Sequence, residues 1–418
     1  MKARWSRRLI GLLRVRLADP RFEGVTDPRR RARRWPLVTC LRAMVVAMVS
    51  GAQSFKDLEN LTAEMSVAAR RALGFKRRLP DTTARDRIIR LSPRDLMAAL
   101  YHQVRAAFRR KALEPDKLPW GVLSMDGKAT SIGAWDDEYA QKQGSLGMLR
   151  TITATLVSTA ARICVGAIPI PPKTNEVGHF QSALGELLEA YRGLDLFRVV
   201  MYDAGGCSEA NARYVRDQHL HYVMVLNDGQ PTLFGEAKTV LGRQGVDQAA
   251  RVEVDSGVRY TLWLTTEMAK FLDWTHLRVV LRVRREKLRS DGTVSSAGER
   301  YFLTSLRRDA LDGLGWLRLI RSRWGVENNS HNLYDSIYKE DDRPWINADP
   351  TGALNIALLR RIAANLFILF RARTLRGEST RLTPWRDLLR RAYNALISAT
   401  DAVVDGLRAR QPPPSPAT

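Results

Sequence analysis

Hydrophobic positions follow a helical period through the first part of the chain. Residues 37–51 and 54–66 repeat apolar side chains at helical spacing, and a break containing Gly51 separates them. The stretch 78–111 continues in the same style, with many arginines between its apolar positions. We therefore predict an all-α region over residues 1–117, which is an ordinary size for a domain.

From Leu118 onward the pattern changes to short β-branched runs separated by turn residues, which predict strands. The predicted elements are, in order, strands at 121–126, 149–159 and 162–170, a helix at 179–193, a strand at 197–203, a helix from Ser208 and a strand at 221–227. Three strands, helix, strand, helix, strand is the order of a ribonuclease-H-like core. The predicted fold class is therefore α/β, with the first part of this core at residues 118–227.

Residues 228–307 mostly alternate between apolar and polar positions, which predicts antiparallel strands in a β-rich insertion. A helical pattern then begins near residue 312, and we assign 308–350 to the second part of the core. Residues 351–410 return to helix and form a basic helical C-terminal region. The Pro-rich residues 411–418 are expected to be a disordered tail.

The net charge of +23 is unevenly distributed over the 418 residues. Residues 1–120 hold 28 Lys and Arg against 11 Asp and Glu, and residues 351–418 hold 11 against 4, whereas the middle is nearly neutral. Basic ends around a neutral centre favour a core with arms that bind a polyanion, and the helical N-terminal region could include a helix-turn-helix reader. The alternatives are a basic but solvated surface and a plain helical bundle.

The spacing of the cysteines and the length of the apolar segments indicate the cellular compartment. Cys40, Cys164 and Cys207 are widely spaced, which indicates buried thiols in a reducing cytoplasm rather than a disulfide framework. The long apolar region near the N-terminus contains Arg42 and is too short to span a bilayer. We expect a cytoplasmic protein with no membrane partner.

Three carboxylates carry the candidate chemistry. Asp126 and Asp203 each end an apolar, β-branched run, and Glu327 lies in a helical pattern much further along the chain. Acids at strand ends, joined by an acid on a helix, suit two divalent ions that clamp the attacking and leaving oxygens of a phosphodiester. We predict all three as catalytic residues and as ligands of two Mg²⁺ ions, for which Mn²⁺ can substitute. Taken singly, each acid also fits a hairpin turn, a helix N-cap or a surface ion pair.

Basic and aromatic residues near these acids are candidates for DNA contact. Lys128 follows the first acid by two positions, and Arg323, His331 and Tyr334 fall close to one helical face with Glu327. In the insertion, Trp274, Arg282 and Arg284 are aromatics and cations of the kind that stack on bases and grip phosphates, although a core Trp with a solvated Arg edge fits equally well. Glu340, Asp341 and Asp342 are rival third ligands, but three successive acids look more like a solvated turn.

Several blocks of the sequence resemble one family in order and spacing. DPRRRARRWPLVTCLRAMVVAMVSGAQSFKDL, LSMDGKA, KTNEVGHFQSALGELL, VVMYDAGGCSEANARYV and IRSRWGVENNSHNLYDSIYKEDDRPW are similar to stretches of the DDE insertion-sequence transposases. The similarity is to the IS4-like group, in the branch that includes the H-repeat-associated proteins. It implies that Asp126, Asp203 and Glu327 are the catalytic triad. Of the wider group's Tyr-Arg-Glu-Lys signature only Arg323 and Glu327 match, because Ile320 and Tyr334 stand at its ends.

The expected function is a DNA transposase: metal-dependent cleavage at insertion-sequence ends, followed by 3′-OH strand transfer into target DNA. The resemblance implies double-stranded DNA as partner, with terminal inverted repeats and a target, and a homodimer or higher synaptic complex. Two alternatives stay open. One is a domesticated, catalytically silent DNA-binding protein, and the other is a structure-selective DNA nuclease. Changes from the family pattern after Asp126 and at Asp228 leave altered activity possible.

Overall fold

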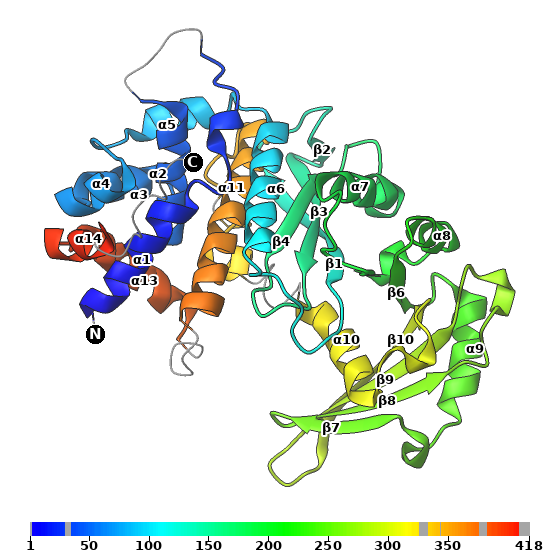
Figure 1. The fold of residues 1–418 in the computed structure, drawn as a ribbon. Coiled ribbons are helices and arrows are strands. Elements are labelled where there is room, and N and C mark those ends of the chain that lie inside the picture. Colours follow the sequence, from blue (N-terminus) through cyan, green and yellow to red (C-terminus); the bar gives the residue numbers. More distant parts are fainter. Residues whose placement is uncertain (1, 30–34, 326–332, 343, 376–382, 409–418) are drawn as a thin grey trace, which may run out of the picture.

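The computed structural model describes residues 2–29, 35–325, 333–342, 344–375 and 383–408 (Figure 1). It is a mixed α/β protein with helical parts at both ends of the chain and a large mixed sheet between them. The N-terminal helices are α1 (Lys2–Arg16), α2 (Leu37–Val49), α3 (Phe55–Glu64), α4 (Val67–Leu73), α5 (Asp81–Ile88) and α6 (Pro93–Arg109), with a short 3-10 turn at Phe22–Gly24. The N-terminal region is helical, which confirms the prediction made from the helical spacing of its apolar residues.

The C-terminal helices pack against the N-terminal ones, so the two ends of the chain share one helical body. These elements are α11 (Pro350–Leu369), a π-helical turn at Phe370–Thr374, α13 (Trp385–Ile397) and α14 (Asp401–Arg408). α11 lies against α2 and α6, while α1 contacts α13 and α14. The helix Pro350–Thr374 is long and apolar enough to cross a membrane by composition, but 94% of its most apolar window is buried inside the protein. It therefore serves as the central helix of this body.

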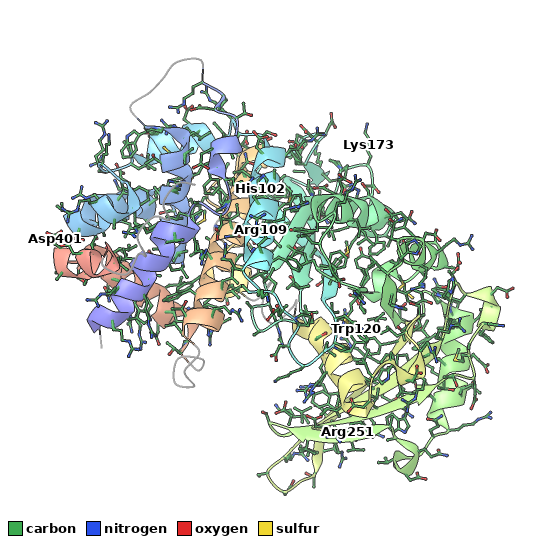
Figure 2. The ribbon with its side chains drawn as sticks, in the orientation of Figure 1. His102, Arg109, Trp120, Lys173, Arg251 and Asp401 are labelled. Carbon is green, nitrogen blue, oxygen red and sulfur yellow. The ribbon has the colours of Figure 1, made fainter. Side chains whose placement is uncertain are left out.

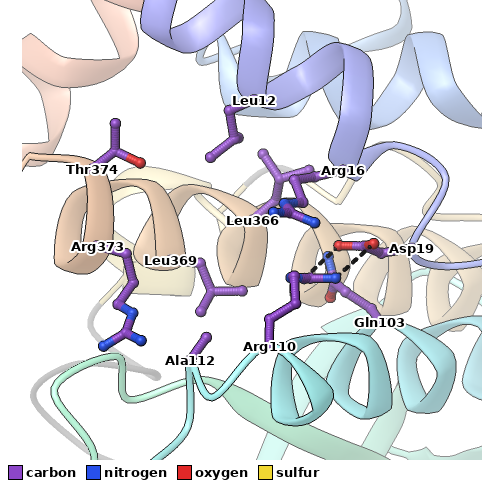
Figure 3. A pocket seen from close by; sticks show the side chains of 10 residues that line it. All are labelled: Leu12, Arg16, Asp19, Gln103, Arg110, Ala112, Leu366, Leu369, Arg373 and Thr374. Atoms are coloured by element: carbon purple, nitrogen blue, oxygen red, sulfur yellow. Dashed lines mark hydrogen bonds and ion pairs between the residues drawn. The ribbon is translucent and has the colours of Figure 1, made fainter. Parts of the chain in front are cut away.

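A small cavity of about 160 Å³ lies inside the helical body, among α1, α6 and α11 (Figure 3). Arg110 crosses it and donates two hydrogen bonds to the Asp19 carboxylate, at 3.0 and 2.7 Å. Leu12, Leu366 and Leu369 line the rest of its wall together with Arg16 and Arg373. The cavity is a gap between packed helices and lies apart from the acids considered below.

The described residues contain a ten-stranded sheet whose main path runs β2-β3-β1-β5-β6-β10-β9-β8-β7, with β4 paired to β3. The strands are β1 (Val122–Ile132), β2 (Ala140–Gln143), β3 (Leu146–Leu156), β4 (Cys164–Pro169), β5 (Val199–Tyr202), β6 (His221–Leu226), β7 (Arg251–Asp255), β8 (Val258–Thr265), β9 (Val279–Leu288) and β10 (Val294–Thr304). β1, β5 and β6 are parallel, whereas β3 and β10 run antiparallel to their neighbours. Buried β-branched runs form the parallel centre, as such strands require.

Helices connect and cover the strands. α7 (Glu176–Ala190), α8 (Glu209–Asp217), α9 (Pro231–Gly242) and α10 (Gly313–Gly325) lie along the sheet, with short helical turns at Ala204–Gly206, Val246–Gln248, Phe271–Asp273, Arg308–Ala310 and Leu333–Ile337. Asn175 and Ser208 cap α7 and α8 by accepting backbone hydrogen bonds. The predicted order of three strands, helix, strand, helix, strand is present, with the short β2 added.

The region predicted as a β-rich insertion continues the same sheet. β10 pairs with β6 through Tyr301–Thr304, and β9, β8 and β7 follow outward from it. α9 packs on β8 and β9, so the region also contains a helix that its alternating pattern did not indicate. The outermost strand β7 and the first half of β10 carry no buried side chains, so these parts of the region are exposed.

Candidate active site

Asp126 and Asp203 meet because two neighbouring strands run in the same direction. β1 and β5 are parallel, and their last paired positions are Met125 and Tyr202. The residue that follows each of these is one of the two acids, so Asp126 and Asp203 occupy neighbouring positions at the carboxyl end of the parallel pairing. Both side chains are half-exposed, which leaves them reachable from solvent. This is the edge at which open α/β sheets bind ligands.

The chain turns sharply after Asp203. Gly206 donates its N–H to the backbone oxygen of Asp203 at 3.0 Å and closes a short helical turn. A Cβ at Gly206 would lie 1.6 Å from the Tyr202 ring, so only glycine fits there. The small residues after the second acid therefore let the chain leave the strand while the Tyr202 ring stays packed under it.

Arg323 on α10 is the partner of the second acid. A guanidinium nitrogen of Arg323 lies 2.5 Å from Asp203 Oδ1, and the Arg323 side chain is only 7% exposed. The sequence indicated Arg323 as a candidate DNA contact, and among the described residues the structure pairs it with Asp203. Glu327 and His331 lie outside the described residues.

Glu176 is a fourth acid beside this pair that the sequence interpretation missed. A Cβ at Gly127 would lie 2.1 Å from a Glu176 carboxylate oxygen, so the side chain occupies the space that glycine leaves open. The Tyr202 hydroxyl donates to the backbone oxygen of Glu176 at 3.1 Å and lies 3.3 Å from its Oε1. Burial raises the pKa of Glu176, and nearby Asp203 adds to the shift. Glu176 lies in the first turn of α7, where an acid usually complements the helix dipole. Its position in the sequence therefore did not indicate a place beside the two aspartates.

The structure corrects the expected role of Lys128. Its ammonium lies 2.6 Å from Asp335 Oδ1 and 3.1 Å from Asp341 Oδ1, and its side chain is 6% exposed. Thr130 donates a further hydrogen bond to Asp341 at 3.2 Å. Lys128 thus fixes the segment after α10 against β1 instead of facing a DNA strand, because two carboxylates more than 200 positions away neutralise it.

The acids at 340–342 do not form a wholly solvated turn, as the sequence had suggested. Glu340 is 3% exposed and forms an ion pair with Arg361 of α11, which is equally buried. Burial alone would raise the pKa of Glu340, but the Arg361 and Arg360 guanidinium groups hold it below its ordinary value. Only Asp341 and Asp342 are exposed. Basic partners on α11 explain how one acid of the three enters the core.

Three other predicted DNA contacts are buried and already engaged. Tyr334 is 1% exposed, with the Arg361 guanidinium 4.1 Å from its ring centre, and Trp274 is 6% exposed. Arg282 is 9% exposed, lies over the Trp263 ring and donates to Glu299 at 2.6 Å. These placements correct the expectation that all three face DNA. Trp274 fits the alternative of a core Trp, whereas Arg282 is buried and does not form the solvated Arg edge of that alternative. Arg284 is 41% exposed and pairs with Glu286.

The arrangement offers oxygen donors but no complete metal cluster among the described residues. Within them, no three His, Cys, Asp or Glu side chains are placed so that they could hold a metal ion together. The two neighbouring aspartates are nevertheless hard oxygen donors of the kind that Mg²⁺ and Mn²⁺ prefer. The three cysteines are buried and unpaired, as the sequence indicated, and belong to the core.

Comparison with known families supports the relationship that the sequence suggested. Residues 20–103 match the family described as DDE_Tnp_1-associated. The N-terminal segment is similar to that family. It spans much of the N-terminal helical region, from the turn before α2 into α6, and none of the acids lies in it.

Solved structures give a distant likeness. A cryo-EM structure of the piggyBac transposase synaptic complex with hairpin DNA is similar over 100% of this chain and 86% of that chain, with 14% identity and a TM-score of 0.44. That degree of similarity is too low to transfer residues or activity. Comparison with curated proteins gives no match.

Proposed function

We propose that this chain is a metal-dependent DNA transposase whose catalytic acids are Asp126, Asp203 and Glu327. The observation that carries the proposal is the parallel pairing of β1 with β5. It brings two acids from distant parts of the sequence to neighbouring positions at the carboxyl end of these strands. The match of residues 20–103 to a family associated with DDE transposases supports the same class. The strand order β3-β1-β5-β6 around the two acids supports a ribonuclease-H-like core as part of the proposal, and the third acid is assigned from the sequence alone.

The donor set fits magnesium. Asp126 and Asp203 supply carboxylate oxygens, Glu327 would complete the set, and Mn²⁺ would substitute for Mg²⁺. When bound, two such ions stabilise charge on the attacking and leaving oxygens of a phosphodiester. In their absence Arg323 neutralises Asp203, so the guanidinium and a cation compete for the same carboxylate.

The remaining residues position these acids. Tyr202 and Gly127 hold Glu176 against the strand that bears Asp126, and Arg323 fixes the side chain of Asp203. Lys128 anchors the segment beyond α10 to β1, two residues from the first acid. Such support from neighbouring side chains keeps catalytic groups within the narrow tolerances that in-line displacement needs.

In the proposed reaction, water attacks the phosphodiester at the element end and frees a 3′-OH. That hydroxyl then attacks a phosphodiester of the target, joining the element to it with departure of the target's 3′ oxygen. The substrates would be terminal inverted repeats and target DNA, bound by a homodimer or larger synaptic complex in the cytoplasm. The assignment to the insertion-sequence branch that includes the H-repeat-associated proteins rests on the quoted blocks.

A cleavage and joining assay tests the proposal. The DNA flanking the coding region, with any inverted repeats it carries, is incubated with the full chain in Mg²⁺ or Mn²⁺. Joined products support a transposase, nicked products without joining indicate a nuclease, and binding without either indicates a silent DNA-binding protein. Asp126→Ala and Asp203→Ala should abolish cleavage while leaving DNA binding largely intact. The exposed Asp342→Ala serves as a matched control and should cut like the wild type.

A further inference from the structure

Thr153 on β3 lies directly opposite the first candidate acid in the sheet. β1 and β3 are antiparallel neighbours, and Asp126 is the register partner of Thr153. Residues that face each other in such a pair carry their side chains on the same face of the sheet, with Cβ atoms about 4.5–5.5 Å apart. Thr153 therefore lies on the face that carries Asp126, within reach of its carboxylate.

The hydroxyl of Thr153 is a buried polar group without a hydrogen bond. Thr153 is 0% exposed, and its Oγ1 has no partner among the residues that the structure describes. A buried hydroxyl in this state carries a desolvation cost, and most buried side-chain hydroxyls avoid that cost by hydrogen bonding. A valine side chain would suit a buried strand equally well without this cost. Packing alone therefore gives no reason for a hydroxyl at this position.

The strand register indicates which group could accept a hydrogen bond from Thr153. On the other side of β3 its register partner is Ala167 of β4, whose side chain is a methyl group. Thr151 and Thr155 share this face of β3, but each lies about 7 Å away along the strand. The Asp126 carboxylate is the acceptor that the register places directly opposite the hydroxyl.

Burial decides what kind of role the hydroxyl can have. Thr153 has no exposed surface, whereas Asp126 is half-buried and can be reached from solvent. A cation or a DNA strand that arrives from solvent would therefore contact the carboxylate and not the threonine. Carboxylates that bind metals are commonly fixed by hydrogen bonds from neighbouring side chains. Thr153 is placed to give this support to Asp126.

We propose that Thr153 is a positioning residue of the cation site, and that its hydroxyl donates a hydrogen bond to the Asp126 carboxylate when that carboxylate binds a divalent cation. Rotation about the Cα–Cβ bond moves the hydroxyl between staggered positions while the strand stays in place. The hydrogen bond would hold one carboxylate oxygen and so orient the other toward the cation. The inference rests on the proposed function, since it assumes that Asp126 is a metal ligand.

Two substitutions separate the hydroxyl of Thr153 from the rest of its side chain. Thr153→Val replaces the hydroxyl with a methyl group, whereas Thr153→Ser keeps the hydroxyl. Mn²⁺ affinity of the full chain, followed by electron paramagnetic resonance, should fall by at least about tenfold in Thr153→Val and stay at the wild-type value in Thr153→Ser. Equal affinity in Thr153→Val and wild type would overturn the role of Thr153.

Thr261→Val is the matched control for this titration. Thr261 is also buried on a strand of the sheet, but β1, β5, β6, β10 and β9 lie between its strand, β8, and β3. β8 pairs with the edge strand β7, whose Arg251 is labelled in Figure 2. Thr261→Val should bind Mn²⁺ like the wild type.

Urea unfolding in the absence of metal distinguishes a positioning role from a structural one. Because Thr153→Val removes a buried hydroxyl that has no partner, its unfolding midpoint should equal or exceed that of the wild type. Weaker Mn²⁺ binding with an unchanged or higher midpoint supports the proposal. Weaker binding with a lower midpoint would overturn it, because damage to the fold would then account for the loss.

Asp126→Asn separates failure of this inference from failure of the proposed function. If Asp126→Asn weakens Mn²⁺ binding and Thr153→Val does not, the role of Thr153 is overturned and the proposed function stands. If Asp126→Asn binds Mn²⁺ as tightly as the wild type, both are overturned.

Discussion

Arg323 and Asp203 join α10 to the end of β5 through a contact of 2.5 Å between a guanidinium nitrogen and Oδ1 of the carboxylate. The arginine is almost fully buried, whereas the aspartate is 42% exposed. A cation that reached the acid pair from solvent would have to share Asp203 with this guanidinium. The ion pair therefore fixes the orientation of the Asp203 carboxylate and limits how freely that carboxylate can bind a cation.

Replacing Arg323 should separate these two effects. In Arg323→Met, Asp203 loses its partner, and we expect a loss of about 1–2 kcal/mol in the free energy of unfolding, because a charged hydrogen bond is removed. Mn²⁺ affinity of the free protein should rise at the same time, since the competing cation is gone. Arg318→Met, which removes an exposed arginine from the same helix, should change neither by more than about 0.5 kcal/mol. Urea denaturation and Mn²⁺ titration measure the two quantities, and a fall in Mn²⁺ affinity in Arg323→Met would contradict the competition.

Lys128 should matter for stability more than for DNA affinity. Lys128→Met removes the tie to Asp335 and Asp341, which are themselves partly exposed, so we expect a loss of about 1–3 kcal/mol. Lys142→Met, at an exposed position on β2, is the control for loss of a lysine charge. Urea denaturation measures the loss. If Lys128 instead gripped DNA, its replacement would leave stability unchanged and lower the salt dependence of DNA binding.

Stability should depend on the buried Glu340 in a pH-dependent way. Arg361 and Arg360 outweigh burial and hold the pKa of Glu340 below its ordinary 4.5. A lowered pKa in the folded state means that ionised Glu340 stabilises the protein above pH 4.5, and that this stability is lost as pH falls through the folded-state pKa. Glu340→Gln should therefore cost about 3–5 kcal/mol at pH 7 and less in acid, because it leaves buried guanidinium groups without their anion.

Thermal or urea unfolding from pH 7 down to pH 3, which passes below the ordinary pKa of 4.5, measures the difference between wild type and Glu340→Gln. Asp342→Asn, in the same turn but exposed, should follow the wild type at every pH. A difference that stays constant or grows toward acid pH would show that the charge of Glu340 is not what stabilises the fold.

The contact between Gly127 and Glu176 predicts a rescue. Gly127→Ala places a methyl group where a Glu176 oxygen now lies, and we expect a cost of about 1–3 kcal/mol from overpacking. The double variant Gly127→Ala/Glu176→Ala removes the clash and should be more stable than Gly127→Ala alone. A double-mutant cycle by urea denaturation measures the coupling. Strictly additive losses would mean that the two residues do not share this space.

The sequence predicted the elements well where its signal was local. The apolar period identified the N-terminal helices. The β-branched runs before Asp126 and Asp203 predicted two strands, which pair with each other, although β1 continues past Asp126 to Ile132. The alternation of apolar and polar residues in 228–307 predicted the strands of this region. It did not predict the helix α9, which begins at a proline after a short polar turn. Local pattern also did not reveal that this region extends the core sheet.

Side-chain environment was harder to predict, because it depends on partners far away in the chain. Lys128 looked like a DNA contact until Asp335 and Asp341 were found beside it. Tyr334 and Arg282 looked like surface groups, yet Arg361 and Glu299 accompany them in buried positions. Glu176 was missed for the same reason, since nothing near it in the sequence places it against Gly127.

Mn²⁺ binding, followed by electron paramagnetic resonance on the full chain, tests most directly whether Asp126 and Asp203 share one cation site. Wild type, Asp126→Asn, Asp203→Asn and the control Asp342→Asn would be titrated under identical conditions. We predict that each site substitution weakens Mn²⁺ binding by at least about tenfold, equivalent to about 1.4 kcal/mol, and that the control binds like wild type. Equal Mn²⁺ affinity in all four proteins would contradict a shared carboxylate site at this edge of the sheet.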